Sequence, residues 1–446
     1  MQHAQTRAAG RIAAVVAGTA AATLAFAGCA GSDAGASGGD KTTIRFLYAT
    51  GDETWNSVVE GVVDAFNAQS EDTVVELDPL PAGSDYATAL KTMDATGNWP
   101  AVVDMRDTIT YIQAGKLAPI PESVTELLKP EVYGAAEDGN VYTVPTSALN
   151  GEIGINIVYD KDYFAEHDLE VPETYDDFVA LLEDIQANGD APLATAAAEV
   201  WPSDQLWKPL AAPVFAEYSE TGFWNAVIDG SASIEDLREP LERLKTITDD
   251  FVLEGWQSTA DAQTTTLLVN GQAIMATSSA GIGRLNDINK VDPEFDAGLF
   301  IIPSDDGSID VLKNAVIGDT AGGLAISAQA EEDGEEYDSA VEFLEYFYSV
   351  DAANLIEELG WISPNIAAAD EVVRNTSIPG SADYFALLEN PSLAWYSNDT
   401  SNEALTAFNT FFRQTRIEMQ DGQISVDEAI AKLQAEFDKS VVPAAG

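Results

Sequence analysis

The sequence predicts an α/β fold of two lobes, each a mostly parallel sheet flanked by helices. Strand-like and helix-like segments alternate along the chain, and the alternation restarts after Pro145. The chain has 446 residues, which exceeds what one hydrophobic core usually supports. In such folds ligands bind at the carboxyl ends of the strands.

The alternation is read from hydrophobic periodicity. Before Pro145, strands are expected at 43–48, 73–77 and 101–105, with helices between and after them. After Pro145, strands are expected at 154–159, 194–198, 273–277, 298–302 and 323–327. The helices expected there lie at 174–188, 234–250, 337–349, 352–359 and 426–438.

The N-terminus has the pattern of a secretory signal. Arg7 and Arg11 precede an apolar stretch over 12–27 that is shorter than a membrane span of ~20 residues. The segment 26–29, Phe-Ala-Gly-Cys, resembles the lipobox of bacterial lipoproteins, with Phe where Leu is usual. A signal peptide over 1–28 and a lipid on Cys29 are therefore predicted; an ordinary signal peptide with an incidental Cys is the alternative.

A flexible tether is predicted directly after this segment. Residues 29–40 are rich in Gly, Ser and Ala and offer nothing to bury. Cys29 is the only cysteine of the chain, so no internal disulfide can form. Lipidation would also remove an exposed thiol that is open to oxidation outside the cell.

The net charge restricts the class of ligand but does not identify the ligand. The chain carries 21 basic and 75 acidic residues, a formal charge of −54. This charge repels nucleic acid and anionic lipid, and it favours neutral or cationic small ligands. The alternative is that the acids only form a solvated surface that keeps the protein soluble.

Several short passages follow one another in an order typical of one family. The clearest are at 97–104, 114–119, 138–145, 159–164 and 270–275. Together they resemble the extracellular solute-binding proteins of ABC importers, specifically the sugar-binding family that includes the maltodextrin-binding proteins. The resemblance covers about residues 43–440, nearly the whole body after the tether.

This resemblance implies a periplasmic-binding-protein-like fold of class II with a hinged ligand cleft. It implies an N-terminal lobe at 41–146 plus 300–328 and a C-terminal lobe at 147–299 plus 329–446. Crossings are expected near 144–149, 299–303 and 327–330, and ligand binding would close the hinge. The implied protein is a monomer on the outer face of the cell membrane. It would pass a mono- or oligosaccharide to the transmembrane subunits of an ABC permease.

A sugar ring has an apolar face that Trp can cover and a polar rim that carboxylates, amides and Arg can bind. We expect stacking rings at Trp55, Trp201, Trp207, Trp361 and Trp395, the last in a loop before a helix. Polar contacts are expected from Asp52, Glu53, Arg106, Asp107, Ser278, Ser279, Gly281, Asn409 and Arg413. The remaining indoles, at Trp99, Trp224 and Trp256, are assigned to structure.

Other classes of function remain open at this point. A glycosidase needs two carboxyls ~5–5.5 Å apart, which 75 acids could supply, but no motif marks such a pair. His167 is the only histidine after the signal segment, which argues against a zinc site or a Ser–His–Asp triad. We therefore expect that the protein is not an enzyme and that it binds no cofactor and no zinc. Calcium bound by clustered acids remains possible. A polyamine or another organic cation is the alternative ligand, and neutral solutes other than sugars also remain open.

Overall fold

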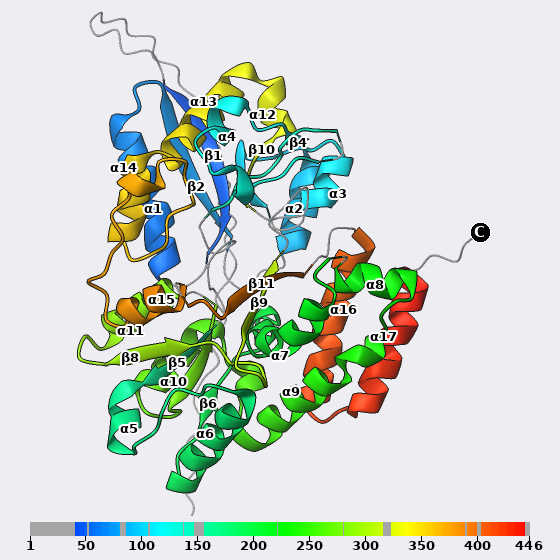
Figure 1. The fold of residues 1–446 in the computed structure, drawn as a ribbon. Helices are drawn as coiled ribbons and strands as arrows, with labels where there is room; N and C mark the ends of the chain where they lie inside the picture. The colour runs from blue at the N-terminus through cyan, green and yellow to red at the C-terminus, as the bar shows by residue number, and fades with distance from the viewer. Residues whose placement is uncertain are drawn as a thin grey trace, which may run out of the picture. The chain divides into compact units, whose positions relative to one another are not determined.

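The computed structural model describes residues 41–50, 53–80, 86–105, 108–136, 138–146, 156–220, 222–279, 281–314, 323–388, 390–398 and 403–441. The predicted signal peptide, the tether and Cys29 lie outside these residues. Residues 41–446 form one compact unit that holds two main sheets (Figure 1). Within the described part of the chain, no helix is long and apolar enough to span a membrane.

The first sheet has the strand order β2-β1-β3-β10-β4 and forms the N-terminal lobe. Its strands are β1 (Thr42–Ala49), β2 (Thr73–Leu80), β3 (Val102–Met105), β4 (Leu117–Ala118) and β10 (Gly323–Ser327). The pairs of β1 with β2 and with β3 are parallel, whereas β10 runs antiparallel to β3 and β4. The helices of this lobe are α1 (Glu53–Gln69), α2 (Tyr86–Thr96), α3 (Thr108–Gln113), α4 (Glu122–Thr125), α12 (Ala328–Glu332), α13 (Gly334–Phe347) and α14 (Val350–Glu358).

The second sheet has the order β6-β7-β5-β8 and forms the C-terminal lobe. Its strands are β5 (Asn156–Asp160), β6 (Leu193–Ala194), β7 (Met275–Ser278) and β8 (Ala297–Phe300). Only β6 and β7 are parallel, while β5 is antiparallel to β7 and β8. The prediction of a mostly parallel sheet is therefore wrong for this lobe. A separate parallel pair is formed by β9 (Ile309–Asn314) and β11 (Leu393–Asn398).

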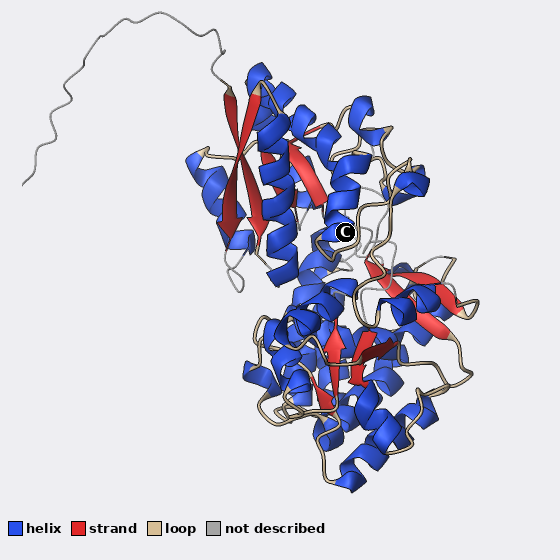
Figure 2. Cartoon of the chain, turned by 90° about the vertical axis from the view of Figure 1, so that its left-hand side faces the viewer, coloured by secondary structure: helices blue, strands red, loops and turns tan. Residues whose placement is uncertain are grey.

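Helices surround the second sheet, as the view in Figure 2 shows. They are α5 (Lys161–Glu166), α6 (Tyr175–Asn188), α7 (Asp204–Glu217), α8 (Phe223–Asp229), α9 (Arg238–Phe251), α10 (Asp261–Val269), α11 (Ile282–Val291), α15 (Ser381–Leu388), α16 (Glu403–Gln420) and α17 (Val426–Ser440). Local sequence defines several of their ends. Thr174 and Asp177 form a capping box at the start of α6, and Gly189 ends this helix in the left-handed conformation.

The core contacts correct the predicted lobe boundaries. Phe343 of α13 packs on Phe46 and Phe66, with ring centroids 5.6 and 5.3 Å apart, so α13 belongs to the N-terminal lobe. Phe300 packs on Tyr159 in the core of the C-terminal lobe, at 5.8 Å. The boundaries predicted at residues 300 and 328 are therefore wrong, because apolar segments alone do not show which sheet they cover.

Two of the predicted crossings are wrong for the same reason. Ile301 and Ile302 stay in the cores of the C-terminal lobe. Ser327 caps α12, and Ala330 of that helix is buried in the N-terminal core. The chain passes from the C-terminal cores to the N-terminal core between Val311 and Leu324, and it returns within 361–378. The predicted crossing at 144–149 lies partly outside the described residues.

Candidate functional site

One edge of the second sheet gathers the chain segments that could bind a ligand. In the sheet register Asn156 lies opposite Ser278, and Ala194 lies opposite Ala276. The start of β5 and the ends of β6 and β7 therefore meet at the same edge. The 195–203 loop leaves this edge after β6, and the turn that leads into α11 leaves it after β7.

The 195–203 loop holds an exposed indole on a strained turn. Trp201 is 41% exposed, which is rare for a large apolar side chain among the described residues. Its backbone N–H donates to the carbonyl of Glu199 at 2.8 Å, which closes a γ-turn around Val200. Val200 has φ 67° and ψ −51°, the rare strained form of this turn. For a β-branched residue this conformation costs about 1–3 kcal/mol.

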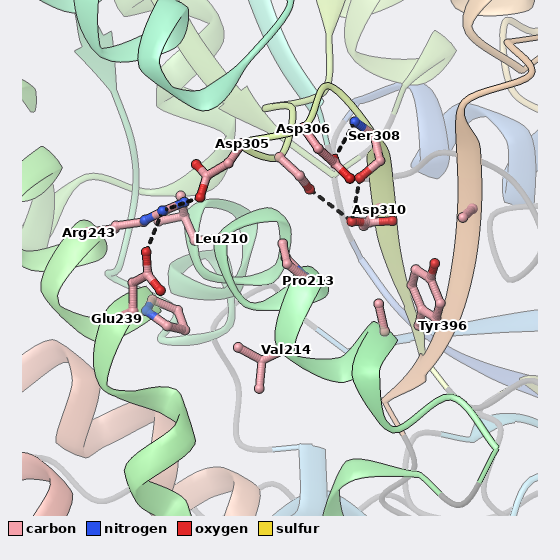
Figure 3. Close-up of a pocket in the computed structure, with 14 residues that line it drawn as sticks. Leu210, Pro213, Val214, Glu239, Arg243, Asp305, Asp306, Ser308, Asp310 and Tyr396 are labelled. Atoms are coloured by element: carbon pink, nitrogen blue, oxygen red, sulfur yellow. Dashed lines mark hydrogen bonds and ion pairs between the residues drawn. The ribbon is translucent and has the colours of Figure 1, made fainter.

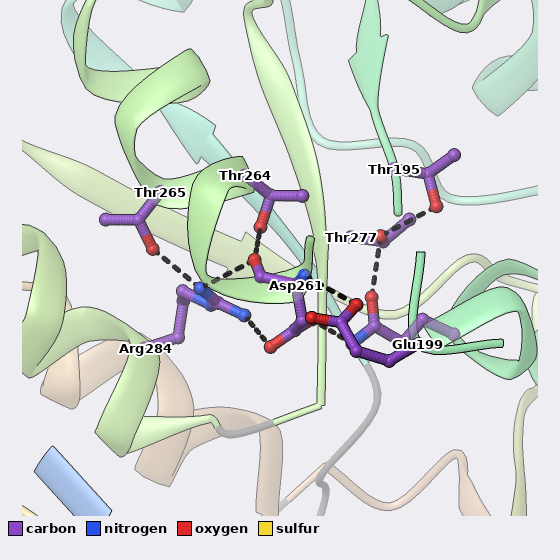
Figure 4. A network of polar contacts seen from close by, with 8 residues as sticks. Thr195, Glu199, Asp261, Thr264, Thr265, Thr277 and Arg284 are labelled. Atoms are coloured by element: carbon purple, nitrogen blue, oxygen red, sulfur yellow. Dashed lines mark hydrogen bonds and ion pairs between the residues drawn. The ribbon is translucent and has the colours of Figure 1, made fainter. Parts of the chain in front are cut away.

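A buried polar network lies behind the loop (Figure 4). Asp261 accepts hydrogen bonds from Gln205 Nε2 and Arg284 Nη2, both at 2.7 Å. The backbone N–H of Asp261 donates to Glu199 Oε2 at 3.2 Å. Thr277 of β7 donates to Gln205 Oε1 at 2.8 Å. The network therefore joins the 195–203 loop to β7, α7, α10 and α11.

A second group of charges supports the other end of the loop. Arg413 donates to Asp204 Oδ2 from Nε and Nη2, at 2.8 and 2.6 Å. Arg416 pairs with Asp204 Oδ1 and donates to the carbonyl of Ser203 at 3.3 Å. Burial alone would raise the pKa of Asp204, but Arg413, Arg416 and Lys208 outweigh it and hold this pKa well below its usual range.

Trp207 lies in the core of the C-terminal lobe, which contradicts its predicted role as a stacking ring. It is 4% exposed and meets Phe412 edge to face, with centroids 5.2 Å apart. The guanidinium of Arg416 lies 4.9 Å from the centroid of its ring. In α7 it shares a buried face with Leu210 and Ala211, at helical spacing, which draws it inward.

Trp55 and Trp361 also have packing roles in this structure rather than open faces. They are 8% and 6% exposed, and their centroids lie 5.7 Å apart. The indole N–H of Trp55 donates to the carbonyl of Ala49 at 3.1 Å. Trp361 lies so close to Gly283 that a Cβ there would come within 2.0 Å of its ring. Their predicted stacking on a ligand is contradicted because neighbouring side chains cover the rings.

The same region joins the two lobes through a helix cap. The backbone N–H of Thr54 donates to Asp287 Oδ1 at 3.2 Å, and its hydroxyl donates to the same oxygen. Asp287 of α11 thus caps the first turn of α1. Burial raises the pKa of Asp287, against the effect of these hydrogen bonds. We call Thr54, Trp55, Gly283, Asp287 and Trp361 the lobe contact.

The remaining predicted site residues are placed as follows. Ser278 is fully buried at the sheet edge, Ser279 is half-buried, and Gly281 precedes α11 with φ 50°. Glu53 is exposed on α1, and Asn409 is half-buried on α16. Trp395 lies in β11, not in a loop, and its side chain is not described. The predicted contacts that lie outside the described residues are Asp52, Arg106 and Asp107.

A cavity of about 530 Å³ lies elsewhere in the C-terminal lobe, between α7, α9 and the β9–β11 pair (Figure 3). Its charged groups already have partners. Arg243 donates to Asp305 at 2.8 Å, and Asp310 accepts from Ser304 and Ser308 at 2.8 and 3.0 Å. The edge with Trp201 is the better candidate, because the described residues leave this side chain 41% exposed and its ring offers an apolar contact to a ligand. Over the residues that the structure covers, no cluster of three or more His, Cys, Asp or Glu could hold a metal ion.

Comparison with known proteins assigns the family. The profile of the bacterial extracellular solute-binding proteins matches residues 61–379. The chain belongs to this family. This solute-binding protein is 26% identical over 353 residues to the multiple sugar-binding protein of Streptococcus mutans. That match covers 74% of this chain and 79% of the relative.

Solved structures share the two-lobed fold. A chitin oligosaccharide binding protein superimposes with a TM-score of 0.74 at 19% identity, over 91% of this chain and 100% of that one. A sugar transporter from Bacillus licheniformis in complex with stachyose gives a TM-score of 0.68 at 17% identity, over 89% and 100%. The predicted α/β fold of two lobes is thus confirmed.

Proposed function

We propose that this solute-binding protein captures a saccharide outside the cell and delivers it to an ABC-type permease. The observation that carries the proposal is the exposed indole of Trp201, held on a strained turn at the ligand edge of the second sheet. Similarity to a multiple sugar-binding protein and to proteins described as binding chitin oligosaccharide and stachyose supports it.

The chemistry of this edge suits a neutral sugar. The ring of Trp201 can cover the apolar face of a pyranose, and each such aromatic contact buries up to ~150–250 Å². The half-buried carboxylate of Glu199 can accept from sugar hydroxyls, and the partly exposed guanidinium of Arg413 can donate to them. One ring and a few placed polar groups are what orient a small ligand.

A saccharide panel tests the proposed function. Stachyose and a chitin oligosaccharide are titrated into the protein by calorimetry, with spermidine as the cationic alternative. We expect saturable binding of at least one saccharide and none of spermidine. Saturable binding of spermidine alone would replace the sugar with an organic cation, which the charge of −54 would favour electrostatically.

The membrane anchor is the second part of the proposal. We infer that Cys29 carries a lipid that holds the protein on the outer face of the cell membrane, because it is the only cysteine and follows Phe-Ala-Gly. Cys29→Ala is expected to move the protein from the membrane fraction to the medium with unchanged saccharide affinity. Retention of the variant in the membrane fraction would contradict the lipid site.

A further inference from the structure

Two described residues other than glycine have a positive φ, and they differ in chemistry. Asp168 has φ 54° and lies two residues after the end of α5. Val200 has φ 67° at the centre of the γ-turn before Trp201. Asp tolerates this region because its short polar side chain bonds locally, whereas a β-branched Val does not. Gly would suit a simple chain reversal better than Val does. The strain at Val200 therefore indicates a role other than reversing the chain.

The surrounding contacts hold this strained turn from both sides. Before the turn, Ala198 N–H donates to the carbonyl of Thr259 at 3.1 Å. After the turn, the hydroxyl of Ser203 donates to the carbonyl of Val200 at 2.7 Å. The turn is therefore fixed by contacts to the segment before α10 and by its own continuation into α7.

The deepest anchor of the turn is Asp261. Its backbone N–H binds the carboxylate of Glu199, the residue directly before Val200. The carboxylate of Asp261 is itself locked by Arg284, which is buried and also donates to Thr265 at 2.6 Å. A buried ion pair with additional hydrogen bonds has little freedom to move, since any displacement would leave a buried charge unpaired.

We propose that the Val200 turn is preorganised for ligand: Val200 and Asp261 are positioning residues that fix the Trp201 ring and the Glu199 carboxylate before the saccharide arrives. This inference rests on the proposed function and adds how its site is built. Neither residue has to touch the ligand. Their effect is to lower the ordering cost of binding, because a loop that is already held loses little entropy when the ligand binds.

The test is Val200→Gly, with Asp168→Gly as the matched control. Both substitutions place glycine, which adopts a positive φ freely, at these positions, so neither should lower the melting temperature of the free protein by much. Val200→Gly is expected to weaken binding of the tightest saccharide from stachyose and chitin oligosaccharide about three- to tenfold, with a less favourable binding entropy. Asp168→Gly is expected to bind as the wild type does. Equal affinity of Val200→Gly and wild type would overturn the positioning role.

A second pair of variants tests the anchor. Asp261→Asn and Asp310→Asn each remove a buried carboxylate in the C-terminal lobe, and both are expected to lower the melting temperature. Only Asp261→Asn is expected to weaken saccharide binding, by about tenfold. If both variants bind like the wild type, the anchor is structural and the inference fails. A wild type that binds neither saccharide would overturn the proposed function, and this inference with it.

Discussion

The 195–203 loop and the lobe contact use tryptophan in opposite ways. In the loop, Trp201 is 41% exposed above a layer of buried hydrogen bonds and ion pairs. In the lobe contact, Trp55 and Trp361 bury their rings against each other and against Gly283. The polar layer contacts the loop through Glu199 and leaves Trp201 exposed, whereas the apolar contact covers both rings.

Because of this difference, the lobe contact should affect the stability of the fold, and the 195–203 loop should affect ligand binding. Apolar area that is buried within the chain stabilises the fold by ~25 cal/mol per Å². Exposed apolar area contributes to stability only weakly and remains available to a ligand. Substitutions in the lobe contact should therefore change the free energy of unfolding, and substitutions at Trp201 should change affinity.

The largest change in stability is expected for Trp361→Ala. Removing this buried ring leaves a cavity beside Gly283 and Trp55, so the free energy of unfolding should fall by about 3–5 kcal/mol. Urea denaturation of the unliganded protein measures it. A loss below about 1 kcal/mol would mean that the ring is not packed as described.

A smaller, pH-dependent change is expected at Lys208. Burial lowers the pKa of Lys208 to about 8 from 10.5, despite the opposite effect of Asp204. Between these values the unfolded chain binds more proton at Lys208 than the folded chain does, so stability should rise with pH across this window. The rise due to this group is at most about 3 kcal/mol.

Comparison with Lys208→Met isolates this contribution. The wild type is expected to gain stability relative to the variant as the pH rises from about 8 to 10.5, measured by urea denaturation at several pH values. Tyrosines that titrate in the same range affect both proteins alike. Parallel pH profiles would contradict the lowered pKa of Lys208.

The helix cap across the lobes should make a modest contribution. Thr54→Val removes the hydroxyl that donates to Asp287, and this loss should cost about 1 kcal/mol. Thr92→Val is the control, since Thr92 is exposed and its hydroxyl donates within α2, to the carbonyl of Thr88. The two variants are compared by thermal denaturation. Equal melting temperatures would show that the cap adds nothing.

The sequence predicts where helices and strands lie better than it predicts which other elements they pack against. Hydrophobic periodicity places β10 at its observed bounds and α17 within two residues of its end. It does not show that α13 packs on the first sheet, since an apolar helix face fits either lobe. The sequence also does not distinguish the two indoles, because Trp201 and Trp207 are only six residues apart. The start of α7 between them decides that Trp207 is buried and Trp201 is exposed.

Other features of the site leave no signal in the sequence. Asp261, Arg284 and Gln205 form one network although 79 residues of sequence separate Gln205 from Arg284. No short motif marks them, because their contacts form only when β7 and three helices meet. The strain at Val200 is likewise invisible, since the residues around it contain no Gly that would indicate a positive φ.

The most direct test of the account is a titration of Trp201→Ala with the saccharide that the wild type binds most tightly, paired with its melting curve. The lost stacking area predicts about 2 kcal/mol of binding, roughly thirtyfold in affinity, with an unchanged melting temperature. Trp207→Ala should instead lower the melting temperature strongly, because its ring is in the core. Wild-type affinity in Trp201→Ala, or a melting temperature that falls as far as in Trp207→Ala, would contradict the assignment of Trp201 to the ligand site.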